Sequence, residues 1–141
     1  MTDAGLLTKK LAFIETCVRE LRTLARPAEI TRDVREQRFV EHTLQIAIQA
    51  ALDVASHIVS DERLGEPRRH SELFAILARH GWLSEDLATT MRNIVGLRNI
   101  VVHGYQDVDL GIVRNTVEHR LDDLLRFGEE IRRRLGSDEP R

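Results

Sequence analysis

The chain has 141 residues, of which 42% are apolar and 31% charged, and this composition is typical of one soluble domain with a core of its own. Aromatic residues make up only 4%, and Pro and Gly are sparse, which disfavours a sheet protein. The formal net charge of −2 disfavours a general affinity for nucleic acid, so any contact with RNA must be local or assembled from more than one chain.

The sequence begins with neither the basic opening nor the apolar run of a signal peptide, and no stretch approaches the ~18 apolar residues of a membrane span. We therefore expect a cytoplasmic protein. Cys17 is the single cysteine, which excludes an internal disulfide. It lies among apolar positions of a helical pattern, so we expect a buried structural thiol.

Hydrophobic periodicity predicts five helices, of which the first two are long. The first covers about residues 6–25 and stops before Pro27, which cannot continue a helix. The second begins near Thr31 or Asp33, either of which could be its N-cap, and continues to about residue 59. About eight turns is long for a helix of a globular domain, so this helix should dominate the core.

Three further helices follow after a break. The third is short, about residues 71–79, and Gly81 lies in the position of a helix stop. Ser84 is the expected N-cap of the fourth helix, which meets Gly104. The fifth can start at a cap formed by Asp109 and extends close to the polar tail.

Short connections between long amphipathic helices favour antiparallel packing. We therefore predict an all-α fold, an antiparallel bundle of about five helices that forms one domain over residues 1–141. The polar ends, about residues 1–5 and 137–141, should be frayed.

The segment with the most chemical character is Leu97–Tyr105, which places a fixed cation, an imidazole and a phenol near one helix end. Asn99 and His103 are four residues apart, so they share a face and can form a hydrogen bond. Arg98 and His103 are five apart, about 140° around an ideal helix, and would not converge on one small target. Either the helix end is distorted, or the site combines groups from two chains.

These side chains suit the cleavage of RNA without a metal. That reaction needs a base for the 2′-OH proton, positive charge at the phosphate, and an acid for the leaving 5′ oxygen. Histidine transfers protons near neutral pH, and arginine binds phosphate with a planar fork. On spacing alone, however, Arg98, His103 and Tyr105 would more commonly be surface or capping residues.

The segment resembles the R-x4-H-x-Y motif of HepT-like HEPN-domain toxins, in which Arg98, His103 and Tyr105 match in type and spacing. Asn99 matches the polar residue that often follows the arginine in HEPN motifs, and the likeness extends from about residue 39 to residue 131. The resemblance implies an all-helical homodimer whose Arg–His pairs form a composite site between protomers. It also implies metal-independent endoribonuclease activity without a cofactor, with tRNA as the target of some relatives.

The same resemblance implies a partner and a form of control. The partner would be a small MNT-type nucleotidyltransferase, the antitoxin of a type VII toxin–antitoxin system, which transfers AMP from ATP to Tyr105. In this interpretation Arg98 stabilises the phosphate, His103 acts as acid or base, and Asn99 orients the histidine or the phosphate. A bulky anion two residues from His103 would then fill the phosphate pocket and neutralise Arg98.

Two alternatives remain open from the residues. Asp53, on a polar stripe of the second helix, could orient Arg98 or His103, or could form an internal salt bridge or hydrogen bond that keeps helices in register. Asp53 and His57 would give a metal only two ligands, so no metal site is predicted. The low basic charge also permits another function, a non-catalytic helical module that binds a nucleotide or its nucleotidyltransferase partner.

Overall fold

The computed structural model describes residues 3–103 and 110–138, with side chains for residues 3–97 and 110–136. This part of the chain forms α-helices and one short 3-10 helix and contains no strand, which confirms the all-α prediction. The elements in chain order are α1 (Ala4–Leu24), η1 (Pro27–Glu29), α2 (Val34–Asp61), α3 (Glu72–Arg79), α4 (Glu85–His103), α5 (Leu110–His119) and α6 (Leu121–Asp138).

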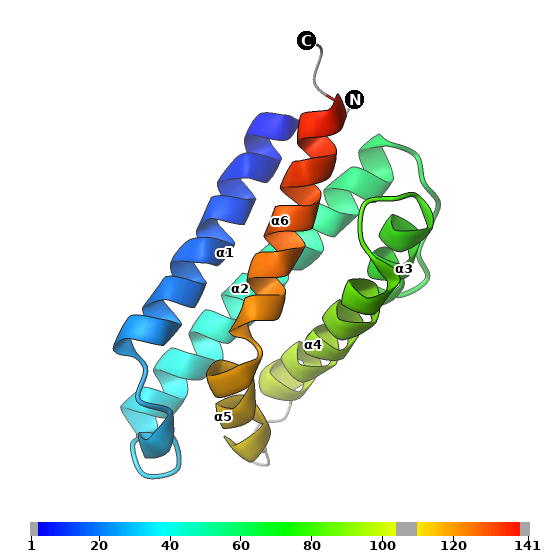
Figure 1. The fold of residues 1–141 in the computed structure, drawn as a ribbon. Helices are drawn as coiled ribbons and strands as arrows, with labels where there is room; N and C mark the ends of the chain where they lie inside the picture. The colour runs from blue at the N-terminus through cyan, green and yellow to red at the C-terminus, as the bar shows by residue number, and fades with distance from the viewer. Residues whose placement is uncertain (1–2, 104–109, 139–141) are drawn as a thin grey trace.

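The long helices pack as an antiparallel bundle (Figure 1). Helix α1 packs against α2 and α6 and runs opposite to both. Helix α4 packs against α2, α3 and α6, and the short α3 covers only the first part of α4. The start of α1 and the end of α6 lie at the same end of the bundle, whereas α4 runs toward the opposite end, so its last turn is remote from both (Figure 1).

Local hydrogen bonds explain where the helices begin and end. Of the two predicted caps of α2, Asp33 has this role, because its Oδ1 accepts a hydrogen bond from the backbone N–H of Arg35 at 2.9 Å. The predicted cap Ser84 accepts from the backbone N–H of Leu87 at 3.3 Å, at the start of α4. Gly81 has φ +79°, the left-handed conformation that ends a helix at low cost only for glycine.

The core lies along the inner faces of α1, α2, α4 and α6. Phe74 of α3 and Phe127 of α6 are both fully buried, and their rings meet edge to face with centroids 5.9 Å apart. Cys17 is 1% exposed, as predicted for a structural thiol. Burial, and to a lesser extent the nearby Glu20 carboxylate, raises the pKa of this thiol to about 11.

The predicted fifth helix is two helices, α5 and α6, that meet at Arg120 (Figure 1). Apolar side chains continue at helical spacing through this point, so the bend is not visible in the periodicity. The acids Asp122 and Asp123 lie in the first turn of α6, where the helix dipole favours negative charge. The ends of the described chain are also helical further than predicted, since α1 includes Ala4 and α6 extends to Asp138.

Helix α6 also stabilises the turn between α3 and α4. Glu130 of α6 accepts a hydrogen bond from the backbone N–H of Ser84 at 2.7 Å. The Arg134 guanidinium lies 5.3 Å from the centre of the Trp82 ring, and Trp82 is 3% exposed. Helix α4 therefore starts from a position that α6 stabilises. Within the described residues, no helix combines the length and apolar character needed to cross a bilayer.

Candidate functional site

Helix α4 carries three of the predicted site residues, Arg98, Asn99 and His103, in its last two turns. Tyr105 lies outside the described residues. Because α4 is α-helical through His103, positions 98 and 103 are separated by about 140° and by about 7.5 Å along the axis. The structure therefore does not bring these two positions together on one face, which favours the two-chain alternative over a distorted helix end.

The exposure of earlier residues in α4 indicates, by helical register, on which face of the helix positions 98 and 103 fall. Position 98 is seven residues after Met91, which is fully buried, and three after Val95, which is 3% exposed. Position 103 is seven residues after Gly96 and eleven after Arg92, both of which are exposed. By helical register, position 103 therefore falls in line with the exposed residues Arg92 and Gly96, and position 98 falls in line with the buried residues Met91 and Val95.

Gly96 is an exposed glycine in the interior of a helix. A Cβ at this position would meet no atom within 4 Å outside its own helix backbone, so nothing described in this chain requires the absence of a side chain. Glycine in a helix interior costs roughly 0.8–1 kcal/mol relative to alanine. Gly96 therefore leaves the helix surface uncovered at a position that is in register with position 103, and it does so at a cost to stability.

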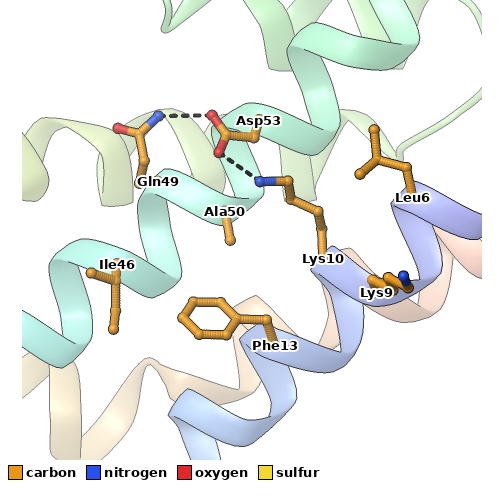
Figure 2. Close-up of a pocket in the computed structure, with 8 residues that line it drawn as sticks. All are labelled: Leu6, Lys9, Lys10, Phe13, Ile46, Gln49, Ala50 and Asp53. Carbon is orange, nitrogen blue, oxygen red and sulfur yellow. Dashed lines mark hydrogen bonds and ion pairs between the residues drawn. The ribbon is translucent and has the colours of Figure 1, made fainter.

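Asp53 lies in the groove between α1 and α2 (Figure 2). Its two carboxylate oxygens have separate partners: Lys10 Nζ lies 3.2 Å from Oδ2, and Gln49 Nε2 donates to Oδ1 at 2.9 Å. Lys10 belongs to α1, so the contact joins the two helices, as the interhelical alternative requires. The side chains of Arg98 and His103, which Asp53 was predicted to orient, lie outside the described residues.

His57, one turn after Asp53 on α2, pairs instead with Asp61 at 2.9 Å between Nε2 and Oδ2. Asp53 and His57 therefore have different ion-pair partners, although both line one pocket between α1 and α2. Over residues 3–103 and 110–138, no group of three or more His, Cys, Asp or Glu side chains is arranged to hold a metal ion.

A groove of about 250 Å³, which the sequence motif did not indicate, lies beside α4. We call it the α3–α4 groove. It is lined from the α3 side by Ser71, Ala75, Ala78 and Arg79, and from α4 by Glu85, Ala88, Thr89 and Arg92. No local pattern in the sequence indicates this groove, because Arg79 and Arg92 belong to different helices that only the fold brings together.

Comparison with known proteins identifies relatives over most of the chain. The family model described as "Ribonuclease HepT-like" matches residues 14–131. The protein named mRNA nuclease HepT from Shewanella oneidensis is 31% identical over 128 residues, which cover 90% of this chain and 96% of that protein. The protein named tRNA nuclease HepT from Aphanizomenon flos-aquae is 36% identical over 74 residues, which cover 52% of this chain and 50% of that protein.

The fold agrees with these relatives. A solved structure described as a tri-AMPylated Shewanella oneidensis HEPN toxin in complex with MNT antitoxin superposes with a TM-score of 0.84. It is 31% identical and covers 94% of this chain and 99% of that one. A second solved structure, described as a toxin–antitoxin with AMP-PNP, has a TM-score of 0.85 and 30% identity, over 92% of this chain and 98% of that one.

Proposed function

This chain belongs to the HepT-like ribonuclease family, and we propose that it is the toxin of a HEPN/MNT (type VII) toxin–antitoxin pair. In this role it is a metal-independent endoribonuclease that acts through Arg98 and His103. The observation that supports the proposal is that positions 98 and 103 belong to the last two turns of a regular helix, α4, in a fold that matches a HEPN toxin along nearly its whole length.

The proposed reaction is cleavage of an RNA phosphodiester by its own 2′-OH. One His103 imidazole takes the 2′-OH proton, the 2′ oxygen forms a bond to phosphorus, and the bond from phosphorus to the 5′ oxygen breaks. A second, protonated His103 gives its proton to that 5′ oxygen, leaving a 2′,3′-cyclic phosphate. Arg98, which is always protonated, stabilises the negative charge on phosphorus in the transition state, and Asn99 orients the histidine or the phosphate.

Two copies of the chain are needed for this arrangement. A single chain offers one His103, whereas the reaction uses a base and an acid, and positions 98 and 103 diverge on the regular helix α4. A homodimer in which two α4 ends meet would supply two histidines and two arginines to one composite site. In this proposal the His103 of one protomer and the Arg98 of its partner act on the same phosphate.

The proposed partner is an MNT-type nucleotidyltransferase, supported by the HEPN toxin of similar fold whose structure contains an MNT antitoxin and AMP modification. Transfer of AMP from ATP to the Tyr105 oxygen would release pyrophosphate and place a phosphodiester anion two residues from His103. That anion would occupy the phosphate position and stop cleavage. We propose tRNA as the target; the relatives are named for mRNA in one case and for tRNA in the other, so fragment mapping must test this choice.

The alternative function, a non-catalytic binding module, has less support because two relatives are named as nucleases. Asp53 is proposed to support the site, although both of its carboxylate oxygens already have partners within the chain. Any effect of Asp53 on Arg98 or His103 would therefore compete with its contact to α1.

The test is cleavage of total cellular RNA in EDTA by purified protein whose Tyr105 is verified as unmodified by mass spectrometry. We expect discrete fragments from wild type and a rate about 10²–10⁴-fold lower for His103→Ala, the usual contribution of acid–base catalysis. Arg98→Ala should fall similarly, and Tyr105→Phe should cleave but resist inactivation by the nucleotidyltransferase and ATP. An undiminished rate for His103→Ala, with native circular dichroism, would contradict the proposal.

A further inference from the structure

The α3–α4 groove and His103 lie on one face of α4. Arg92 on the groove wall and His103 are separated by three helical turns, about 16 Å along the axis and about 20° around it. Gly96 lies between them in helical register, and no described atom lies within 4 Å of the place where its Cβ would be. In the described part of the chain, this face of α4 is therefore open from the groove to Gly96.

The charge in this groove is available for a ligand. Arg79 and Arg92 are exposed, and neither forms an ion pair in the described part of the chain. Some arginines are paired within the chain, for example Arg32 with Glu29 and Arg114 with Glu118, and others form no ion pair there, so what distinguishes Arg79 and Arg92 is that they line one groove. Arg79 and Arg92 come from the two helices that form the groove, so both can reach an anion within it.

The remaining walls suit a phosphate backbone better than a protein surface. Ser71 and Thr89 offer hydroxyl donors, and three alanines leave room for close approach. Protein interfaces are anchored by large apolar and aromatic side chains. The large apolar side chains exposed on the described part of the chain all lie elsewhere, at Leu6, Phe13, Leu24, Val34 and Ile112.

We propose that the α3–α4 groove binds the phosphate backbone of the RNA substrate on one side of the cleaved bond, with Arg79 and Arg92 as its phosphate contacts. This inference rests on the proposed function, because it assigns the path by which RNA reaches His103. It also gives a chain with a net charge of −2 a local contact for a polyanion, because Arg79 and Arg92 line one groove from two helices. Glu85, the one acid of the groove, lies about 27 Å from His103 along α4, beyond Arg92.

The experiment measures binding separately from cleavage. Fluorescence anisotropy with a short, fluorescein-labelled single-stranded RNA is carried out in EDTA on protein that carries His103→Ala. Arg79→Gln, Arg92→Gln and the double variant are each compared at several salt concentrations. Arg19→Gln is the matched control, because Arg19 is exposed on α1, which forms no part of the groove.

We expect each groove variant to raise Kd roughly three- to fivefold at low salt, in the range of one solvent-exposed charge contact. The slope of log Kd against log salt concentration should fall by about 0.7 for each arginine removed, the value for single strands. Arg19→Gln should change neither quantity. Thr89→Lys, which adds a charge to the groove, should tighten binding and steepen the slope.

Unchanged Kd and slope in the double variant would overturn the inference. So would a shift of the double variant to monomer in sedimentation velocity, since the groove would then be an interface between copies of the chain. Failure of the proposed function is a different result, because it concerns cleavage by protein with His103 intact. The anisotropy measurement still decides whether RNA binds in the groove if that cleavage is absent.

Discussion

Replacing Gly96 by alanine should stabilise the protein and at the same time test the face that carries His103. Gly96 lies inside α4, and an added Cβ meets no described atom within 4 Å outside its own helix backbone, so the substitution introduces no clash within the described part of the chain. Alanine removes the conformational freedom that glycine has in the unfolded chain, which is worth about 0.8–1 kcal/mol in a helix interior. For a domain of this size, this corresponds to a rise in Tm of roughly 3–5 °C.

The matched control is Gly128→Ala in α6. A Cβ there would lie 3.8 Å from Leu11 Cδ2, an ordinary van der Waals contact, so this substitution should also stabilise the chain by about 1 kcal/mol. Gly128 is buried between α6 and α1 and has no part in the face that carries His103. Urea denaturation followed by circular dichroism gives the free energy of unfolding for both variants, and cleavage of total RNA gives their activity.

Both alanine variants should be more stable than wild type and should cleave RNA. Gly96→Gln, which extends a longer side chain over the open face, should retain most of the stability gain but lose cleavage, whereas Gly128→Ala should keep full activity. A decrease in stability for Gly96→Ala would refute the reasoning, because it would mean that a Cβ at 96 meets atoms of this chain or of a second copy. Full activity in Gly96→Gln would refute the role of the open face.

Two further predictions follow from contacts within the bundle. Asp53→Asn should lower the free energy of unfolding, measured in urea, by less than about 1 kcal/mol, because Lys10 and Asp53 are each more than a third exposed. A more than tenfold loss of cleavage in this variant would assign Asp53 a supporting role at the site. Unchanged cleavage would leave only its interhelical role. Cys17 should resist iodoacetamide at pH 8 and react once urea unfolds the chain, because burial raises the pKa of its thiol to about 11. Since the folded state binds this proton more tightly than the unfolded state, the free energy of unfolding should fall as pH rises from about 9 to 11. Rapid alkylation of the native protein would contradict the burial of this thiol.

Local sequence patterns predicted those features that depend on interactions between residues close together in the chain. Asp33 and Ser84 cap helices through hydrogen bonds to residues two or three positions away, and such signals are visible in any short window of sequence. The burial of Cys17 followed from its place in an apolar periodicity. The motif was found because Arg98, His103 and Tyr105 have a fixed spacing, which needs no knowledge of tertiary structure.

Features that depend on packing between distant segments could not be predicted. The bend at Arg120 leaves the apolar periodicity intact, so only the packing of α5 against η1 and of α6 against α1 reveals it. The partner of Asp53 is Lys10, 43 residues earlier, and no local pattern connects them. The groove that contains Arg79 and Arg92 exists because α3 folds back along α4, and neither arginine stands out in the sequence among the others.

The contacts of α6 with the turn between α3 and α4 determine when this part of the chain can fold during its synthesis. Ser84 and Trp82 contact Glu130 and Arg134, which are made only after the whole of α4. Helix α1 is made before α6 and completes its packing only when α6 is beside it. A nascent chain that includes α4 but not yet α6 therefore lacks part of its core, and a premature stop before α6 leaves a chain that proteases should degrade more readily.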